Sequence, residues 1–135
     1  MIGENYQLIK LIFNHSMEKL PVMYIFVNSD LKMTKGKIAS QVGHVVQLIT
    51  EEIIRQGYES TPTPESYFIY MKWKQNCTKI IKKANSRQLQ LLIAMKEARY
   101  IIDDGQTQVP PNSLTVVGFY PSAELHEVFQ NYKLL

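Results

Sequence analysis

The feature that most constrains this chain is the alternation of short apolar runs with stretches of helical periodicity. Residues 22–28 are apolar and rich in β-branched and aromatic side chains, which is typical of a strand buried on both faces. Thr34 then caps a predicted helix that begins at Lys35 and ends near Gly57. The apolar stripe of this helix consists of Ile38, Val42, Val45, Ile49 and Ile53.

The same alternation continues to the end of the chain. Residues 60–65 contain two prolines and predict a loop, and residues 66–74 predict a short helix or an irregular covering element. Further strands are expected at 77–84, 100–103 and 114–120. Asn85 or Ser86 should cap a helix that runs to about Ala98, and Ser122 should cap a last helix over 122–132. Strands separated by helices predict an α/β fold with helices on both faces of one sheet.

Length and composition favour one compact domain. The 135 residues match the usual size of a single domain, and the net charge of +3 requires that any nucleic-acid partner be met by a local cluster of cations. Cys77 is the only cysteine, so no internal disulfide can form and no paired Cys-x-x-Cys zinc site is possible. We therefore expect an intracellular, cytoplasmic setting.

Residues 1–20 contain an apolar stretch that must be distinguished from a targeting or membrane segment. Lys10 interrupts it, and its length is far below the roughly 20 apolar residues that a membrane span needs. We interpret residues 1–20 as an N-terminal extension, helical and packed on the body of the domain at residues 21–135. Disorder or a partner contact is the alternative.

Three lysines gather where the first strand leads into the first helix. Lys35 and Lys37 fall in the first helical turn, where the helix dipole is unfavourable for cations and favourable for anions. Together with Lys32 and the free backbone N–H groups of that turn, they predict a site for phosphate or for a developing oxyanion. Gly36 leaves room for a close backbone approach. The alternative is a solvated cationic face.

Helical spacing places Lys37, Gln41 and His44 along one edge of the apolar stripe, which we expect to be half-buried. His44 by itself favours a hydrogen-bonded structural histidine over a base or a ligand. His15 and His126 have no metal-ligand spacing to His44, and we expect no metal and no cofactor.

The loop at residues 103–115 concentrates carboxylate, hydroxyl and amide groups after a predicted strand. Ligands in open α/β sheets gather beyond the carboxyl ends of strands, so Asp103 stands where a site is expected. An ordinary Asp-Gly turn is the alternative. The chain lacks a G-x-S-x-G elbow, a phosphate-binding G-x-x-x-x-G-K-[ST] loop and a dinucleotide fingerprint.

The motif DLKMTKGKIASQVGH, followed by IIDDGQTQVPPNSLTVVGFYP and a terminal YKLL, resembles the type II peptidyl-tRNA hydrolases from about Val22 to Leu135. The resemblance implies a three-layer α/β/α fold with a mixed, roughly four-stranded sheet, in a family whose members are commonly dimeric. It also implies metal-independent hydrolysis of the ester that joins a peptide to the 3′ end of tRNA.

Four residues take catalytic roles from this resemblance. They are Lys37, Asp103, Thr107 and Thr115. The resemblance implies that Asp103 activates or holds a water, that Lys37 neutralises the oxyanion or orients Asp103, and that the two threonines align water and ester. Which group acts as the base stays open, because an ammonium neighbour weakens a carboxylate as a base.

The peptidyl-tRNA partner implies phosphate contacts. The expected substrate contacts are Lys32, Lys35, Gln41, His44 and Gln108, with Lys79, Lys82 and Lys83 joining them if the end of their strand lies nearby.

The chain departs from the family pattern at four positions. Asp104 replaces a small neutral residue, and Gln106 and Asn28 each replace a cation, so RNA binding or the pH profile would change. Asn112 stands where glycine is common, but asparagine tolerates left-handed backbone angles.

Two other functions remain open from the sequence: a non-catalytic RNA- or protein-binding module on the same fold, and hydrolysis of another acyl ester. Two roles are open for the aromatic residues Tyr67, Phe68, Tyr70 and Trp73: they cover the sheet, or they form a dimer surface.

Overall fold

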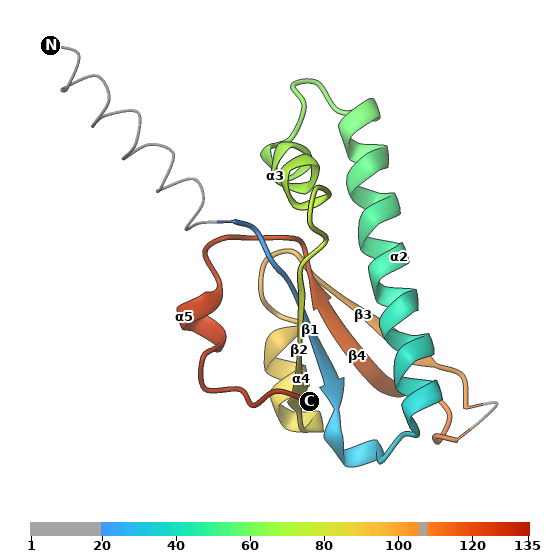
Figure 1. Cartoon of the computed structure of the whole chain (residues 1–135). Helices are drawn as coiled ribbons and strands as arrows, with labels where there is room; N and C mark the ends of the chain where they lie inside the picture. Colours follow the sequence, from blue (N-terminus) through green and yellow to red (C-terminus); the bar gives the residue numbers. More distant parts are fainter. Residues whose placement is uncertain (1–19, 106–107) are drawn as a thin grey trace, which may run out of the picture.

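The computed structural model describes residues 20–105 and 108–135, which are built around a mixed four-stranded sheet (Figure 1). Its strands are β1 (Met23–Asn28), β2 (Lys79–Ala84), β3 (Ala98–Asp103) and β4 (Ser113–Phe119). Their order is β2-β1-β4-β3, with β1 parallel to β2 and β4 antiparallel to both β1 and β3. The carboxyl ends of β1, β2 and β3 therefore meet at one edge of the sheet, which we call the carboxyl edge.

Helices cover both faces of this sheet and form two separate cores. On one face lie α2 (Lys35–Glu59) and α3 (Glu65–Trp73), and on the other lie α4 (Ser86–Leu92) and α5 (His126–Phe129); the short 3-10 helix η1 (Ser29–Leu31) follows β1. The predicted α/β/α layering with a mixed sheet is confirmed. Residues 1–19, where we expected a helical extension, lie outside the described residues. No helix in the described part is long and apolar enough to cross a membrane.

The long helix α2 follows its sequence pattern closely. Thr34 caps it by accepting the Lys37 backbone N–H at 3.3 Å. Val45, Ile49 and Ile53 from the predicted stripe are buried. A Cβ on Gly118 of β4 would lie 2.9 Å from the Ile49 side chain, so the helix rests directly on the backbone of β4. This close approach needs a glycine, because any larger residue would push α2 away from the sheet.

A polar cluster ties the second half of α2 to the sheet. Arg99 of β3 donates to the Glu52 carboxylate, with its Nε 2.8 Å from Oε1, and the Tyr120 hydroxyl donates to the same oxygen. Burial, followed by the hydrogen bond to Glu52, raises the pKa of Tyr120 to about 12. The hydrogen bond from Arg99 lowers the pKa of Glu52, so the carboxylate stays charged and holds both partners.

The helix after β2 is shorter than the sequence pattern suggests. Asn85 caps α4 through a capping box with Gln88, as expected, but the helix ends at Leu92 rather than near Ala98. Ala98 pairs with Phe119 as the first residue of β3, and Glu97 before it has a φ of 63°. The chain at Ala98 therefore pairs with β4 as part of β3, although the helical spacing of the preceding residues favoured a longer helix.

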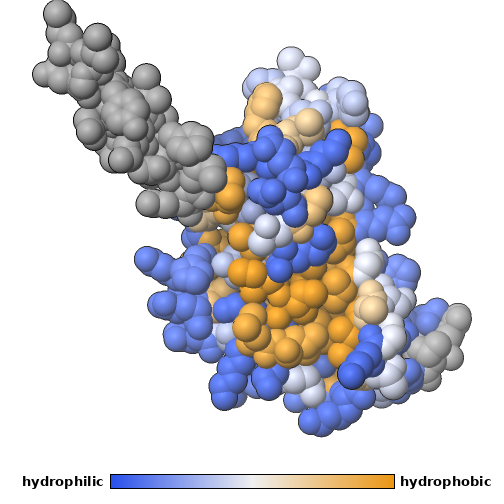
Figure 2. Space-filling model, in the orientation of Figure 1, coloured by the Kyte–Doolittle hydropathy of each residue, from blue (hydrophilic) through white to orange (hydrophobic). Residues whose placement is uncertain are grey.

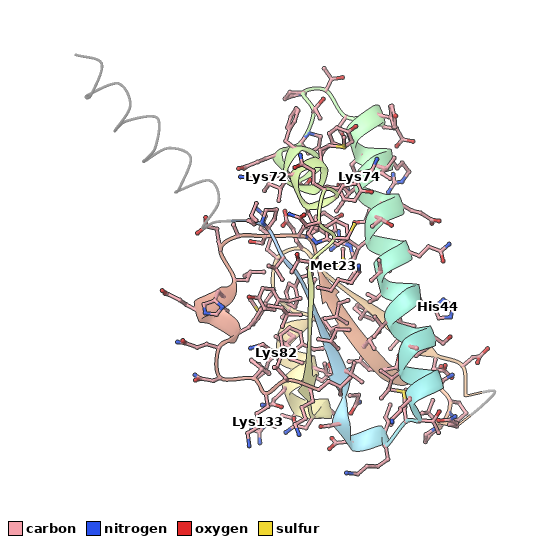
Figure 3. The ribbon with its side chains drawn as sticks, in the orientation of Figure 1. Met23, His44, Lys72, Lys74, Lys82 and Lys133 are labelled. Carbon is pink, nitrogen blue, oxygen red and sulfur yellow. The ribbon has the colours of Figure 1, made fainter. Side chains whose placement is uncertain are left out.

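The predicted last helix over 122–132 is also mostly wrong. Only His126–Phe129 is helical, because the backbone of Ser122 pairs with Val22 and the Ser122 hydroxyl accepts the Glu124 N–H. Lys82, expected at an exposed strand end, is instead buried on the α5 side (Figure 3). Its Nζ donates to the carbonyl oxygens of Phe129 at 2.6 Å and Tyr132 at 3.0 Å.

The aromatic residues of α3 divide between core and surface. Tyr70 and Trp73 are buried against the sheet, and the Trp73 Nε1 donates to the Thr78 carbonyl oxygen at 2.7 Å. Phe68 is 61% exposed. Tyr70 and Trp73 therefore cover the sheet, and Phe68 lies at the surface.

Phe129 should contribute more to stability than its position in a four-residue helix suggests. Its ring is fully buried and contacts the rings of Tyr24, Phe26, Phe119 and Tyr132. We expect Phe129→Ala to lower the free energy of unfolding by about 3–5 kcal/mol in urea denaturation. The neighbouring Val128, which is 53% exposed, is the matched control, and Val128→Ala should cost no more than about 0.5 kcal/mol. Equal losses in the two variants would contradict this account of α5.

Candidate active site

An ion pair joins the start of α2 to the end of β3. The Lys37 Nζ lies 2.5 Å from the Asp103 Oδ2, although the two residues are 66 positions apart in sequence. Their side chains are only 11% and 9% exposed. The sequence alone left the proximity of these groups as an expectation, and the structure brings them together at the carboxyl edge of the sheet.

The Asp103 carboxylate is held from two sides. Lys37 donates to one oxygen, and the backbone N–H of Gly105 donates to the other at 2.7 Å. The hydrogen bond from Lys37 lowers the pKa of Asp103 most, followed by the Gly105 hydrogen bond, with a smaller contribution from the charge of His44. The acid is therefore ionised at neutral pH and its orientation is fixed before any substrate binds.

The loop after Asp103 depends on two left-handed residues. Gly105 has a φ of 80°, and a Cβ there would lie 2.5 Å from the backbone nitrogen of Pro111, so only glycine fits. Asn112 has a φ of 61°, which confirms that asparagine can adopt the left-handed angle at this position.

A second polar contact lies one helical turn along α2. The Gln41 Nε2 donates to the Thr115 hydroxyl at 2.8 Å, and that hydroxyl donates to the Ile101 carbonyl oxygen at 3.2 Å. Ile101 pairs with Val116 and Ile102 with Leu114, so Thr115 is the extra residue of a β-bulge. Both Gln41 and Thr115 are buried, which places them behind the surface rather than in contact with solvent.

Gln108 connects the loop to the first turn of α2. Its side-chain oxygen accepts the Thr34 backbone N–H at 2.9 Å, and its side-chain nitrogen donates to the Thr34 hydroxyl at 2.7 Å. The same hydroxyl also accepts the Lys37 N–H as the helix cap. Gln108, an expected substrate contact, uses its two polar atoms to hold the loop beside Lys37 in this structure. The sequence spacing gave no signal for this pairing.

The remaining predicted residues differ in their placement. Lys32 and Lys35 are exposed at the entrance to α2. His44 is exposed and directed outward from α2 (Figure 3), so the half-buried edge we expected includes Lys37 and Gln41 but not His44. The reason is that β3 is the last strand of the sheet, so little covers this flank of α2. Thr107 and Gln106 lie outside the described residues, and Asp104 is exposed.

Asn28 has a structural function that the sequence did not indicate. Its side-chain nitrogen donates to the Leu114 carbonyl oxygen at 2.8 Å and to the Ser86 hydroxyl at 3.1 Å. Its side-chain oxygen accepts the Asp30 N–H at 2.9 Å and so caps η1. The asparagine that stands in place of a cation thus links β1, β4 and the start of α4.

Acid, ammonium and ordered amide groups at the carboxyl edge of an α/β sheet are typical of a hydrolytic site that works through charge and positioning. Within residues 20–105 and 108–135, no group of three or more His, Cys, Asp or Glu side chains could hold a metal ion.

Comparison with known proteins gives the family. The model of the family described as Peptidyl-tRNA hydrolase PTH2 matches residues 21–135. The peptidyl-tRNA hydrolase of Staphylothermus marinus is 33% identical over 119 residues, which covers 82% of this chain and 92% of that protein. The peptidyl-tRNA hydrolases of Saccharolobus islandicus and Saccharolobus solfataricus are 33% and 32% identical, each covering 76% of this chain and 87% of its own. The chain therefore belongs to the peptidyl-tRNA hydrolase PTH2 family.

Removing the Lys37 ammonium should raise the pKa of Asp103. We expect Lys37→Met to move the Asp103 carboxyl titration to higher pH, measured by NMR of the side-chain carboxyl carbon, because the largest stabilisation of the ionised form is removed. Lys35→Met, in the same helical turn but exposed, should leave the titration in place.

The Lys37–Asp103 ion pair also makes the free energy of unfolding depend on pH. Because the folded-state pKa of Asp103 is lowered, its contribution to stability is present above the ordinary aspartate pKa of about 3.9 and is lost as the pH falls through the folded-state value. An unchanged Asp103 titration in Lys37→Met would show that the ion pair does not set this pKa.

Proposed function

We propose that this chain hydrolyses the ester bond of peptidyl-tRNA and releases free tRNA and peptide. The observation that carries the proposal is the Lys37–Asp103 ion pair, held at the carboxyl edge of the sheet by Gly105 and by the Gln108 contact to Thr34. Membership of the PTH2 family, over residues 21–135, supports the same reaction.

The ionised Asp103 carboxylate holds a water molecule in line with the ester carbonyl carbon. Lys37 makes this carboxylate a weak base, but the proton of the water becomes acidic as the water attacks, and Asp103 accepts it at that point. The tetrahedral intermediate carries negative charge on the former carbonyl oxygen, and the Lys37 ammonium stabilises that charge. The bond from the carbonyl carbon to the ribose oxygen then breaks. The ribose oxygen takes the proton from Asp103, so tRNA leaves as an alcohol, and the peptide acid then loses its remaining proton to solvent and leaves as a carboxylate.

Lys37 supplies the positive charge that a metal ion supplies in many hydrolases, so the proposed reaction needs no metal. Gln41 and Thr115 are positioning residues in this scheme. Their buried hydrogen bond fixes the spacing between α2 and β4 one turn beyond the ion pair. Thr107, taken from the family resemblance, is proposed to align the water or the ester.

The polyanionic tRNA is proposed to lie along the carboxyl edge of the sheet. Exposed cations follow this edge away from Asp103: Lys32, Lys35, Lys83 and Lys133. The Lys83 backbone N–H donates to the Lys133 carbonyl oxygen at 2.9 Å, so these two residues are neighbours, and they border a polar pocket of about 220 Å³ that also includes Asn85 and Gln88. Lys79 lies at the opposite end of β2, 5.2 Å from the centre of the Trp73 ring, and is not part of this path.

The family resemblance also leads us to propose a homodimer that acts in the cytoplasm. Phe68 and Met71 on α3 are exposed and offer an apolar surface for the second subunit. Analytical ultracentrifugation over a range of concentrations distinguishes this dimer from a monomer.

Cleavage of purified peptidyl-tRNA tests the reaction directly. We expect Lys37→Ala and Asp103→Asn each to lower kcat by at least about 100-fold, because each removes a group that acts on the transition state. Lys72→Ala and Glu124→Gln, which change charge at exposed positions elsewhere, should keep full activity. Activity should also survive EDTA.

Three outcomes would contradict the proposal in different ways. Full activity in both Lys37→Ala and Asp103→Asn would remove the mechanism. A wild-type chain that binds tRNA but leaves the ester intact across pH would be a binding module. Cleavage of other acyl esters in preference to peptidyl-tRNA would change the substrate.

The tRNA path predicts a specific salt dependence. We expect log(kcat/KM) to fall linearly with log salt, because binding releases counterions from the phosphates. The double variant Lys83→Gln/Lys133→Gln should reduce the slope by roughly 0.7–0.9 for each phosphate that the protein no longer neutralises. The matched double variant Lys72→Gln/Lys74→Gln lies near the opposite end of the sheet and should keep the wild-type slope. Equal slopes in all three proteins would place the tRNA elsewhere.

A further inference from the structure

An apolar groove runs between α2 and β2, on the flank of α2 away from Asp103. Figure 2 shows the apolar side chains gathered at the centre of this face. The groove has a volume of about 960 Å³, and its main lining residues are Ile38, Ala39, Val42, Gly43, Val46 and Ile81. Lys35 and Leu135 border one end, and Thr50 and Lys79 the other.

The groove exists because α2 lies over β3 and β4 rather than over the middle of the sheet. The contact of Gly118 with Ile49 holds the helix over β4, so the same face of β1 and β2 is left partly uncovered. Gly43 and Ala39 have almost no side chain, and a Cβ on Gly43 would have no neighbour within 4 Å. The lining of the groove is mostly apolar, so it suits the apolar face of an amphipathic helix.

We propose that residues 1–19 of the same chain cover this groove as an amphipathic helix. These residues lie outside the described part of the structure, and their sequence carries the pattern that such a surface needs. Apolar residues recur at spacings of three and four and form one stripe: Ile2, Tyr6, Ile9, Phe13, Met17 and Leu20. Polar residues predominate on the opposite side of the same helix, including Glu4, Gln7 and Glu18, although Leu8 and Leu11 lie among them.

The place where residues 1–19 join the domain favours this segment as the occupant of the groove. Met23 of β1 pairs with Lys79, which borders the groove, and Leu20 is only three residues before Met23. Three residues of extended chain span about 10 Å. The segment therefore joins the described domain beside one end of the groove.

The lengths also agree. The groove follows α2 from Lys35 to Thr50, which corresponds to about 22 Å at 1.5 Å per residue. Nineteen residues in a helix span about 28 Å by the same rise. A helix entering beside Lys79 therefore reaches the far end of the groove near Lys35 and Leu135.

Attachment to the domain favours this segment over a second molecule. Short connections give an effective concentration of about millimolar for the tethered partner, which exceeds the concentration of free copies in most conditions. A helix of this length is only marginally stable alone in water, so the groove and the segment stabilise each other by burying apolar surface.

Hydrogen exchange of the full-length chain tests the docking. We expect the backbone amides within residues 5–18 to exchange at least about tenfold more slowly than in an unfolded peptide of the same sequence, independent of protein concentration. Gly43→Trp fills the groove from a helical position with free space, so it should fold normally and remove this protection. Ser40→Trp adds the same side chain at an exposed position of α2 outside the groove and should leave the protection unchanged.

The reciprocal experiment changes the segment instead of the groove. Ile9→Asp places a charge in the apolar stripe and should shift the methyl NMR signals of Ile38, Val42 and Val46. Gln7→Asp adds the same charge on the polar side and should not shift them. Because Ile9 lies in the N-terminal segment, the domain should still unfold cooperatively on heating in both variants, with a lower midpoint only in Ile9→Asp.

Three results would overturn the proposal. The first is amides in residues 5–18 that exchange freely in the wild-type chain at every concentration. The second is protection that rises with concentration together with the sedimentation coefficient, which would make a second copy the occupant. Loss of protection in both tryptophan variants would also count against the groove, since it would mean that any bulky residue on α2 disrupts the segment.

Discussion

The ion pair between Lys37 and Asp103 is the interaction on which the arrangement of this protein depends. It joins the first turn of α2 to the last residue of β3, where a cation at a helix start would otherwise be unfavourable. Asp103 offsets that repulsion, and Lys37 in turn keeps the carboxylate charged and oriented. In the proposed mechanism, the same contact produces the charge pattern that ester hydrolysis needs.

The rest of the structure maintains this contact from a distance. Gln41 and Thr115 fix the helix to the sheet one turn further along, and Glu52 with Arg99 and Tyr120 fixes its far half. Gly118 allows α2 to rest directly on β4, which sets the separation between the helix and the strands. Because these contacts lie on the β3 and β4 side of α2, the opposite flank is left open as an apolar groove.

The strand directions explain why one edge of the sheet gathers the residues proposed to act in the reaction. β1, β2 and β3 all end at the carboxyl edge, so the cations after β1, Lys83 at the end of β2 and Asp103 at the end of β3 lie along the same edge of the sheet. Strand direction is not visible in any single segment, since it follows from how four segments pair. The lengths of the short helices could not be predicted locally for the same reason. α4 ends where the chain must pair as β3, and α5 ends where the contacts of Phe129 and Lys82 hold the backbone in a non-helical conformation.

The sequence by itself determined the strands, the long helix α2 and the kind of chemistry. Periodicity gave the strands and the buried stripe of α2, the cap at Thr34 and the left-handed Asn112 followed from local backbone preferences, and the motifs carried the family resemblance. Only the tertiary structure decided which side chains meet. Four features depend on segments that are far apart in sequence: the Gln108 contact to Thr34, the bulge that buries Thr115, the burial of Lys82 and the exposure of His44. No local pattern encodes the distances between those segments.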